Sequence, residues 1–421
     1  MTALIPGSAI DHAHAGLITD VGVLLLLACA VVALLARRLR LPYTVALLLS
    51  GLALRLIPSL PDVPLTRELV FTGLLPPLIF EAALNLRWTG LQILFSPIIG
   101  MASGGLMLAA MVTAVGMHLL AGWPVLQAAI FGALIAATDP VSVIATLKEQ
   151  RAPRRLQLLL EAESLFNDGT AAVLFSVVLA ISAGIAPTPG NVMAQATLMM
   201  GGGVLCGAVV AKLLVFLIGR TDDPLVEITF SVVAAYGAFL LADHWAASGV
   251  LATLTAGLIF GAHQRAGTVC AQGRDATHAF WEFAAFVANA LVFLLIGLQL
   301  AQQDYLPLLP DIGLAIVIVL AGRCCAVYPV AWLFSRSQAA LDPAEQHLLV
   351  WGGLRGALGL ALAVGLPADL AHRKDIITVT YAVVAFSVLV QGLTMPWLLA
   401  HQAARCPPDP TLDSVEKCHP D

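Results

Sequence analysis

Charged residues are scarce in this chain. Asp, Glu, Lys and Arg make up 11% of its 421 residues, whereas ordinary soluble domains contain about 25%. Hydrophobic residues make up 59%, so the composition excludes a soluble globular domain and predicts an all-α polytopic membrane protein. The net charge of -5 is spread over short loops and forms no basic patch. The expected partner is therefore the lipid bilayer, and nucleic acid is excluded.

Metal-ligand spacings and a signal peptide are lacking as well. The seven cysteines follow no spacing typical of a metal site, so we expect packing residues. Residues 1–16 contain no Lys or Arg and thus lack the basic region of a signal peptide; we expect them to form a short extracytoplasmic segment. Residues 401–421 are polar and rich in proline, which predicts a short, disordered cytoplasmic tail.

What is present is a series of long apolar runs. Stretches of about 20 apolar residues are long enough to cross a bilayer as helices, and residues 17–400 contain thirteen candidates. The predicted segments are 17–36, 42–58, 67–86, 91–119, 125–147, 156–183, 195–219, 224–243, 247–262, 279–301, 312–335, 344–366 and 375–399.

The basic residues set the expected orientation of these segments. With the C-terminus inside, the cytoplasmic loops hold fourteen Lys and Arg and the opposite loops hold four. This positive-inside bias, with an odd number of spans, places the N-terminus outside and the C-terminus in the cytoplasm. We expect a multi-pass protein of the cell (inner) membrane.

Two predicted spans are interrupted by helix-breaking residues. The fifth contains Thr138-Asp139-Pro140, and the twelfth contains the glycine-rich run 352–359. Interrupted helices at matching places indicate a transporter built from inverted repeats, with its site near the middle of the membrane. The two breaks are seven segments apart, which fits helices one to six repeated as eight to thirteen.

The break in the fifth segment has a chemical consequence. Pro140 has no amide hydrogen and clashes with the carbonyl four residues earlier, so the helix is expected to open around residues 136–139 and to free carbonyl oxygens. Such oxygens suit small cations. Thr138 adds a hydroxyl and Asp139 a charge, although a plain proline kink, satisfied by neighbouring Ser and Thr, is the alternative.

The sixth segment places three carboxylates in an apolar run. Each costs about 3 kcal/mol near the centre of a membrane helix, and such residues usually face an ion or proton pathway. Glu161, Ser164 and Asp168 share one helical face, and Glu163 and Asn167 form the neighbouring stripe. Asp168 is the deepest, about 18 Å along the helix from its start. One such carboxylate can hold either a proton or a cation, which is the basis of exchange.

The remaining charged residues in apolar segments either require a partner of opposite charge or have more than one interpretation. We expect Glu163 to form a structural ion pair, preferably with Arg323, with Arg355 as the other candidate. Glu161 lies nearer the cytoplasmic end, where a solvated interfacial acid is an equal alternative. Glu81 is a further acid late in an apolar helix, and it could instead extend toward the interface near an arginine.

Several strings together resemble the bacterial NhaP and animal NHE branch of the monovalent cation/proton antiporters, over roughly segments two to thirteen. The central strings are Ala137-Thr138-Asp139-Pro140-Val141, Glu163-Ser164-Leu165-Phe166-Asn167-Asp168-Gly169-Thr170-Ala171 and Gly353-Leu354-Arg355-Gly356-Ala357. Supporting strings are Leu75-Pro76-Pro77 through Glu81, Glu227-Ile228-Thr229, Ala235-Tyr236-Gly237, Ser248-Gly249-Val250-Leu251-Ala252 and Phe293-Leu294-Leu295-Ile296-Gly297-Leu298.

The resemblance implies an NhaA/NhaP-like antiporter fold with discontinuous crossing helices. It implies a homodimer in which a core bundle, about 91–183 and 312–400, moves against a dimerisation part, about 17–86 and 195–301, by alternating access. No cofactor is implied other than the transported Na+ and H+. We expect this chain to lack the large regulatory tail of some members, which argues against their type of regulation.

The resemblance also assigns roles to single residues. Asp168 becomes the shared cation and proton site, with Na+ held by Asp168, Ser164 and Thr138. The Asp139 region and Glu81 are further or water-mediated contacts, and Asn167 lies beside the carrier. The stabilising pair is Glu163 with Arg323, and Arg355 lies at the second break.

Asn167 predicts the stoichiometry, because electrogenic relatives bear an Asp there. One carboxylate neutralised alternately by one cation or one proton moves no net charge, so we expect electroneutral 1:1 exchange. The sequence leaves the choice among Na+, Li+ and K+ open, and Na+ is favoured by resemblance only. Two other classes are weighed: a cation channel or uniporter, whose filter the chain lacks, and an intramembrane aspartyl protease using Asp139 and Asp168.

Overall fold

The computed structural model describes residues 7–39, 41–56, 65–86, 88–139, 143–144, 147–148, 150, 152–184, 188–219, 223–266, 271–337 and 339–403. Every regular element in these ranges is helical, as the composition predicts. Nine of the described helices are long and apolar enough to cross a membrane, and three shorter apolar helices accompany them. The predicted number of thirteen spans therefore stays a prediction.

The elements occur in the following order along the chain. They are α1 (Gly7–Leu39), α2 (Tyr43–Leu54), η1 (Leu69–Leu74), α3 (Leu75–Asn85), α4 (Trp88–Gly100), η2 (Met101–Gly105), α5 (Leu106–Ala121), α6 (Val125–Ile135), α8 (Arg154–Ser182), α9 (Pro189–Ile218), α10 (Pro224–His244), α11 (Gly249–Arg265), α12 (Ala271–Leu300), η3 (Leu306–Leu308), α13 (Leu309–Leu333), α14 (Pro343–Gly352), α15 (Ala357–Val364), α16 (Arg373–Phe386), η4 (Ser387–Gln391) and α17 (Gly392–Ala403). Of the η elements, η1, η2 and η4 are π-helical turns within longer helices.

Two helices begin earlier than the apolar runs predict. Helix α1 begins at Gly7 rather than Leu17, and α12 begins at Ala271 rather than near residue 279. Both added stretches are polar but contain no proline. Polarity limits membrane insertion but does not prevent helix formation, so an apolar run underestimates helix length. The expected tail lies mostly outside the described residues, since α17 continues to Ala403.

Short polar side chains and prolines fix where several helices start. Thr188, Asp223 and Ser248 each accept a hydrogen bond from a backbone N–H in the first turn of the helix that follows. Asp342 forms a capping box with Glu345 at the start of α14. These side chains satisfy amide groups that have no partner within the helix.

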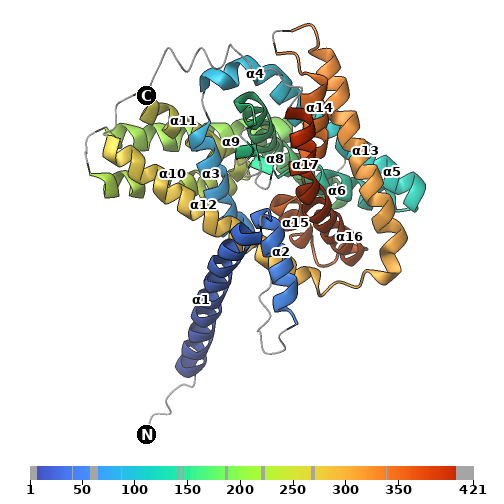
Figure 1. Ribbon diagram of the computed structural model, residues 1–421, viewed down its shortest axis with the longest axis horizontal. Helices are drawn as coiled ribbons and strands as arrows, with labels where there is room; N and C mark the ends of the chain where they lie inside the picture. Colours follow the sequence, from blue (N-terminus) through green and yellow to red (C-terminus); the bar gives the residue numbers. More distant parts are fainter. Residues whose placement is uncertain are drawn as a thin grey trace.

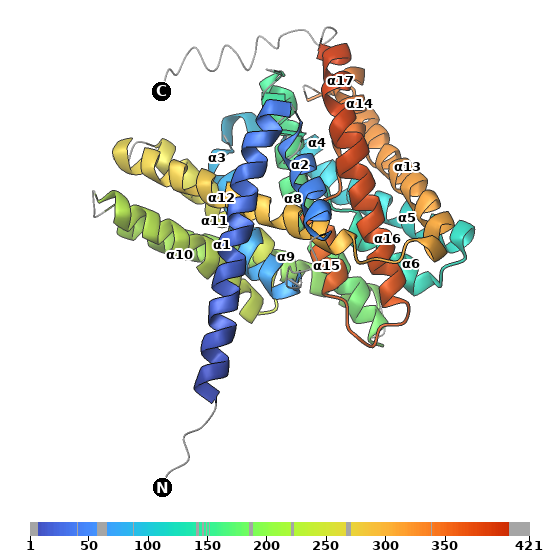
Figure 2. The same cartoon turned by 60° about the horizontal axis from the view of Figure 1, so that its bottom comes forward.

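The helices form two groups on either side of a central region (Figure 1). Helix α12 packs against α2 and α3, and α9, α10 and α11 pack against one another. On the other side, α5 packs between α6 and α13, and α16 packs against α13 and α15. Helix α8 contacts both groups. The first half of α1 projects beyond the rest of the molecule (Figure 2). Whether the groups move as a core and a dimerisation part stays a prediction.

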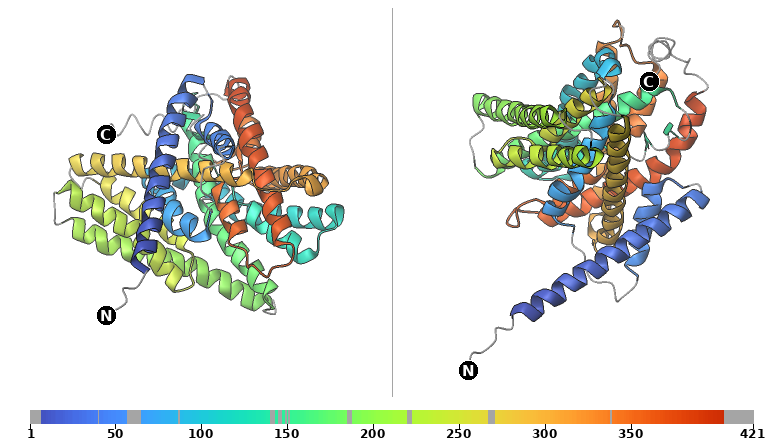
Figure 3. Two further views of the ribbon diagram at one scale, coloured as in Figure 1. Left: turned by 90° about the horizontal axis from the view of Figure 1, so that it is seen from below. Right: turned by 90° about the vertical axis from the view of Figure 1, so that its left-hand side faces the viewer.

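Two interrupted helices meet inside the second group. Helix α6 ends at Ile135, and residues 137–139 continue without helical structure. Pro140, to which the break was attributed, lies outside the described residues. Residues 353–356 separate α14 from α15, and the Asp139 amide donates a 2.7 Å hydrogen bond to the Leu354 carbonyl. The two breaks therefore lie side by side, and α6 and α15 both pack against α16. Figure 3 shows the whole molecule from two further directions.

Candidate functional site

Arg355 joins the two breaks electrostatically. Its Nη1 donates to the carbonyls of Ala136 and Ala137, at 2.6 and 3.1 Å. These carbonyls lie at the C-terminal end of α6, where the helix leaves acceptors without a partner and carries partial negative charge. The backbone amide of Arg355 donates a 2.9 Å hydrogen bond to the Ser387 hydroxyl oxygen. Arg355 thus lies at the second break, as expected, and stabilises the first.

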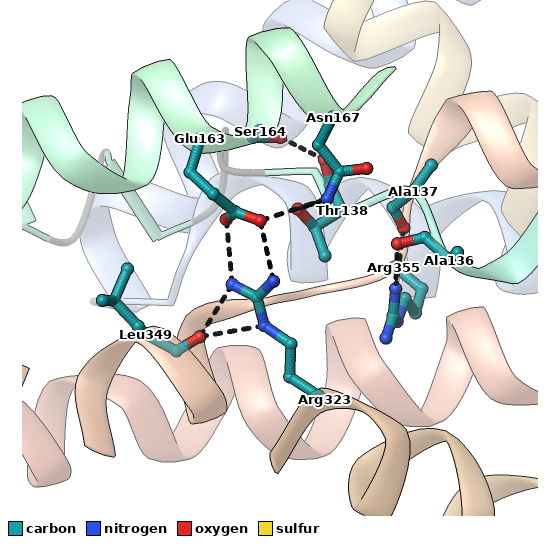
Figure 4. Close-up of polar contacts among 9 residues, drawn as sticks. All are labelled: Ala136, Ala137, Thr138, Glu163, Ser164, Asn167, Arg323, Leu349 and Arg355. Atoms are coloured by element: carbon teal, nitrogen blue, oxygen red, sulfur yellow. Dashed lines mark hydrogen bonds and ion pairs between the residues drawn. The ribbon is translucent and has the colours of Figure 1, made fainter. Parts of the chain in front are cut away.

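A buried ion pair lies beside the breaks (Figure 4). Arg323 Nη1 and Nη2 donate to the two carboxylate oxygens of Glu163 at 2.8 and 2.9 Å, and the Arg323 guanidinium also donates to the Leu349 carbonyl. The Glu163 and Arg323 side chains are 1% and 4% exposed. Of the two arginines considered for Glu163, the structure therefore pairs it with Arg323. This bidentate geometry orients α8 relative to α13 and α14.

Polar side chains from α8 hold the unwound residue 138. The Ser164 hydroxyl donates to the Thr138 carbonyl. Asn167 Nδ2 donates to Thr138 Oγ1 at 3.3 Å and to Glu163 Oε1 at 3.1 Å. Asn167 therefore connects the ion pair to the first break (Figure 4). The Ser164 oxygen keeps lone pairs that a cation could use.

A cavity of about 330 Å³ opens along these elements. At about 30 Å³ per water molecule, it can hold a hydrated alkali ion. Thr138, Asp139, Ser164 and Asp168 line its inner part, and Glu81 lines it from α3. The Asp168 carboxylate faces this space and has no hydrogen bond or ion pair to any described residue. Glu163, Asn167, Arg323 and Arg355 lie outside the lining and support it.

The cavity also contains polar residues that the sequence analysis did not place there. Lys148, Glu282 and Asn289 line it together with Glu161, whose location had been left open. Glu282 and Asn289 are seven residues apart in the mostly apolar segment 279–301, which puts them on one helical face. This spacing is the signal that could have identified them.

Comparison with known proteins decides the family. Residues 23–401 match the family described as "Sodium/hydrogen exchanger, transmembrane". The chain belongs to that family. It is accordingly a multi-pass membrane transporter rather than an enzyme, and the predicted resemblance is confirmed.

The named relatives of this sodium/hydrogen exchanger support the same family. It is 38% identical over 363 residues to the Na(+)/H(+) antiporter ApNhaP of Aphanothece halophytica, a match that covers 85% of this chain and 68% of the relative. It is 34% identical to the Na(+)/H(+) antiporter NhaH of Halobacillus dabanensis, over 90% of this chain and 96% of that protein. The structure of the sodium proton antiporter MjNhaP1 from Methanocaldococcus jannaschii superposes with a TM-score of 0.74, over 92% of this chain and 98% of that one, at 21% identity. The last match establishes the antiporter fold.

Proposed function

We propose that this protein is a secondary active transporter that exchanges Na+ for H+ across the cell membrane. The observation that carries the proposal is the Asp168 carboxylate, which faces a cavity of about 330 Å³ without a partner among the described residues. A carboxylate in that position binds a proton or a cation in turn, because either one neutralises a charge that the membrane interior disfavours. The names of the relatives specify Na+ and H+ as the ions.

The cation site in this proposal is Asp168 with the oxygens of Ser164 and Thr138. Asp139 and Glu81 line the same cavity and contribute negative potential or water-mediated contacts. The helices about 91–183 and 312–400 carry this site between the two membrane faces, while the helices about 17–86 and 195–301 form the homodimer. Li+ and K+ are further candidate substrates.

The orientation of the proposal follows from the charge bias of the loops. Lys148 and Glu161 line the cavity, and Lys148 is exposed; both belong to the loops and helix ends assigned to the cytoplasm. The cavity is then the cytoplasmic access route, with the N-terminus outside and the C-terminus inside the cell.

Replacing Asp168 tests the site. In vesicles with an acidic interior, Na+ added outside wild type protein should raise the internal pH, as reported by a pH-sensitive dye. The Asp168→Asn substitution keeps the shape but loses the ionisable group, so the Na+-dependent signal should fall by at least about a hundredfold. The matched control is Asp375→Asn, which removes a half-exposed carboxylate that is not among the residues lining the cavity. Retained exchange in Asp168→Asn, or no response of wild type to Na+, Li+ or K+, would overturn the proposal.

A single carboxylate site predicts electroneutral 1:1 exchange. Clamping the vesicle potential with K+ and valinomycin should leave the equilibrium Na+ ratio equal to the proton ratio. A potential of 100 mV contributes about 2.3 kcal/mol for each net charge moved, so electrogenic exchange would shift the ratio by about fiftyfold. Flux that ignores the proton gradient would instead favour a channel or uniporter.

A further inference from the structure

The Asn289 side chain is buried in the cavity wall without a partner. It is 7% exposed, lines the cavity from α12, and forms no hydrogen bond within the described part of the chain. Buried amides are nearly always hydrogen-bonded in folded proteins, and those that are not require an explanation. Its amide atoms are not among the fully enclosed polar atoms that lack a partner in the described residues, so the amide is open to the cavity. A group in the cavity that pairs with this amide would provide that explanation.

Packing on α2 fixes the direction of Asn289. One turn earlier on α12, the Phe286 ring stacks on Tyr43 of α2, with centroids 5.2 Å apart and planes 4° from parallel. Farther along, Gly297 touches the backbone of α2 so closely that a Cβ there would overlap the Leu48 carbonyl. These two contacts prevent rotation of α12 about its axis. The amide is therefore held toward the cavity by the backbone of a rigid helix pair.

The depth of Asn289 follows from the spacing of polar residues on two helices. Glu161 and Asp168 of α8 line the cavity seven residues apart, and Glu282 and Asn289 of α12 do the same, a rise of about 10 Å in each helix. Glu161 and Glu282 both lie within electrostatic range of Glu81. The two residues therefore lie at a similar depth, near the mouth of the cavity. Asn289 then lies one level deeper, on the wall opposite the carrier carboxylate.

We propose that the Asn289 amide oxygen is a transient ligand for the transported cation in the cavity-open state. The inference rests on the proposed function of Asp168. Side-chain amide oxygens are suitable ligands for hard cations and carry no charge that would trap the ion. Because Asn289 belongs to α12 and Asp168 to α8, a carrier that moves relative to α12 loses this ligand. Asn289 thus raises cation affinity on one face of the membrane only.

Transport kinetics measured from both faces test the inference. The Asn289→Leu variant keeps the branching at Cγ and removes the oxygen, and Asn289→Thr keeps one oxygen. Right-side-out and everted membrane vesicles give the KM for Na+ on each face. The loss of one ligand in Asn289→Leu should raise the KM for Na+ about tenfold on the cavity face. Asn289→Thr should raise it less. The KM on the other face and the maximal rate should stay close to wild type. The control is Leu78→Ala, which enlarges the same cavity without a polar change.

The outcomes separate this inference from the proposed function. A one-sided rise in KM in Asn289→Leu, absent from Leu78→Ala, supports a cation ligand. Equal KM values in Asn289→Leu and wild type, or equal rises on both faces, overturn it and leave Asn289 as a packing residue or the partner of an ordered water. Loss of folding in Asn289→Leu, detected by size-exclusion chromatography, shifts the decision to Asn289→Thr. Failure of the proposed function itself appears elsewhere, as retained exchange in Asp168→Asn.

Discussion

At the scale of single residues, Asn167 connects the ion pair to the unwound segment. Its amide nitrogen contacts both the Glu163 carboxylate and the Thr138 hydroxyl, while its Oδ1 is buried without a partner among the described residues. The two roles of the side chain therefore depend on its being a donor. An ionised carboxylate in the same place would have no N–H or O–H group to donate.

Replacing Asn167 by Asp should destabilise the protein. The new carboxylate would lie about 3 Å from the Glu163 carboxylate, and two acids at that distance cannot both stay charged without a large penalty. We expect a loss of about 2 kcal/mol or more in stability, seen as a lower midpoint of thermal unfolding in detergent. Asn191→Asp, at the exposed start of α9, is the control. An unchanged midpoint in Asn167→Asp would contradict the donor role.

The residue chemistry was only partly predictable from the sequence. A buried Glu163 requires a positive partner, so the sequence reduced the choice to Arg323 or Arg355. It could not show that Arg355 is occupied by the Ala136 and Ala137 carbonyls, because that contact depends on the crossing of two segments more than two hundred residues apart. Asn289 was missed although its spacing from Glu282 places both on one helical face; that spacing does not show whether the face meets a cavity or a neighbouring helix.

At the scale of elements, the close approach of the two breaks depends on two glycines. A Cβ at Gly356 would overlap the Asp139 side chain, and one at Gly353 would overlap the Arg323 guanidinium. The glycines therefore let the chain between α14 and α15 pass beside the break in α6. Both breaks were predictable, since proline and glycine runs interrupt helices, but their contact was not.

Gly356→Ala should displace Asp139 and weaken transport. The added methyl group has no room unless the breaks move apart, and such overpacking costs about 1–3 kcal/mol. We expect a lower unfolding midpoint together with at least about a tenfold lower rate of Na+-dependent proton movement. Gly104→Ala is the matched control, because a Cβ at Gly104 meets no atom within 4 Å. If both variants exchange ions at the wild type rate, the tight crossing is not required for transport.

At the scale of the whole molecule, the cavity lies where the two helix groups meet. Its walls come from α2, α3 and α12 on one side and from α8, α15 and the breaks on the other. In our proposal this cavity opens to one membrane face, which is one half of an alternating-access cycle. In our proposal only the charge bias of the loops decides which membrane face the cavity opens to. A direct measurement of that face therefore tests the proposed orientation.

A cysteine at position 285 reports that sidedness. Ala285 lines the cavity from α12, between the outer acidic residues and Asn289. The test uses a variant whose native cysteines are replaced and a small, charged methanethiosulfonate reagent. The reagent should label Ala285→Cys in everted vesicles. Labelling in right-side-out vesicles should be at least about tenfold slower, since the reactive thiolate forms only where water reaches it. Val209→Cys, exposed on the outer surface of α9, should stay unreactive from both sides because lipid covers it. Faster labelling of Ala285→Cys in right-side-out vesicles would place the cavity mouth outside the cell and reverse the orientation proposed from the loop charges.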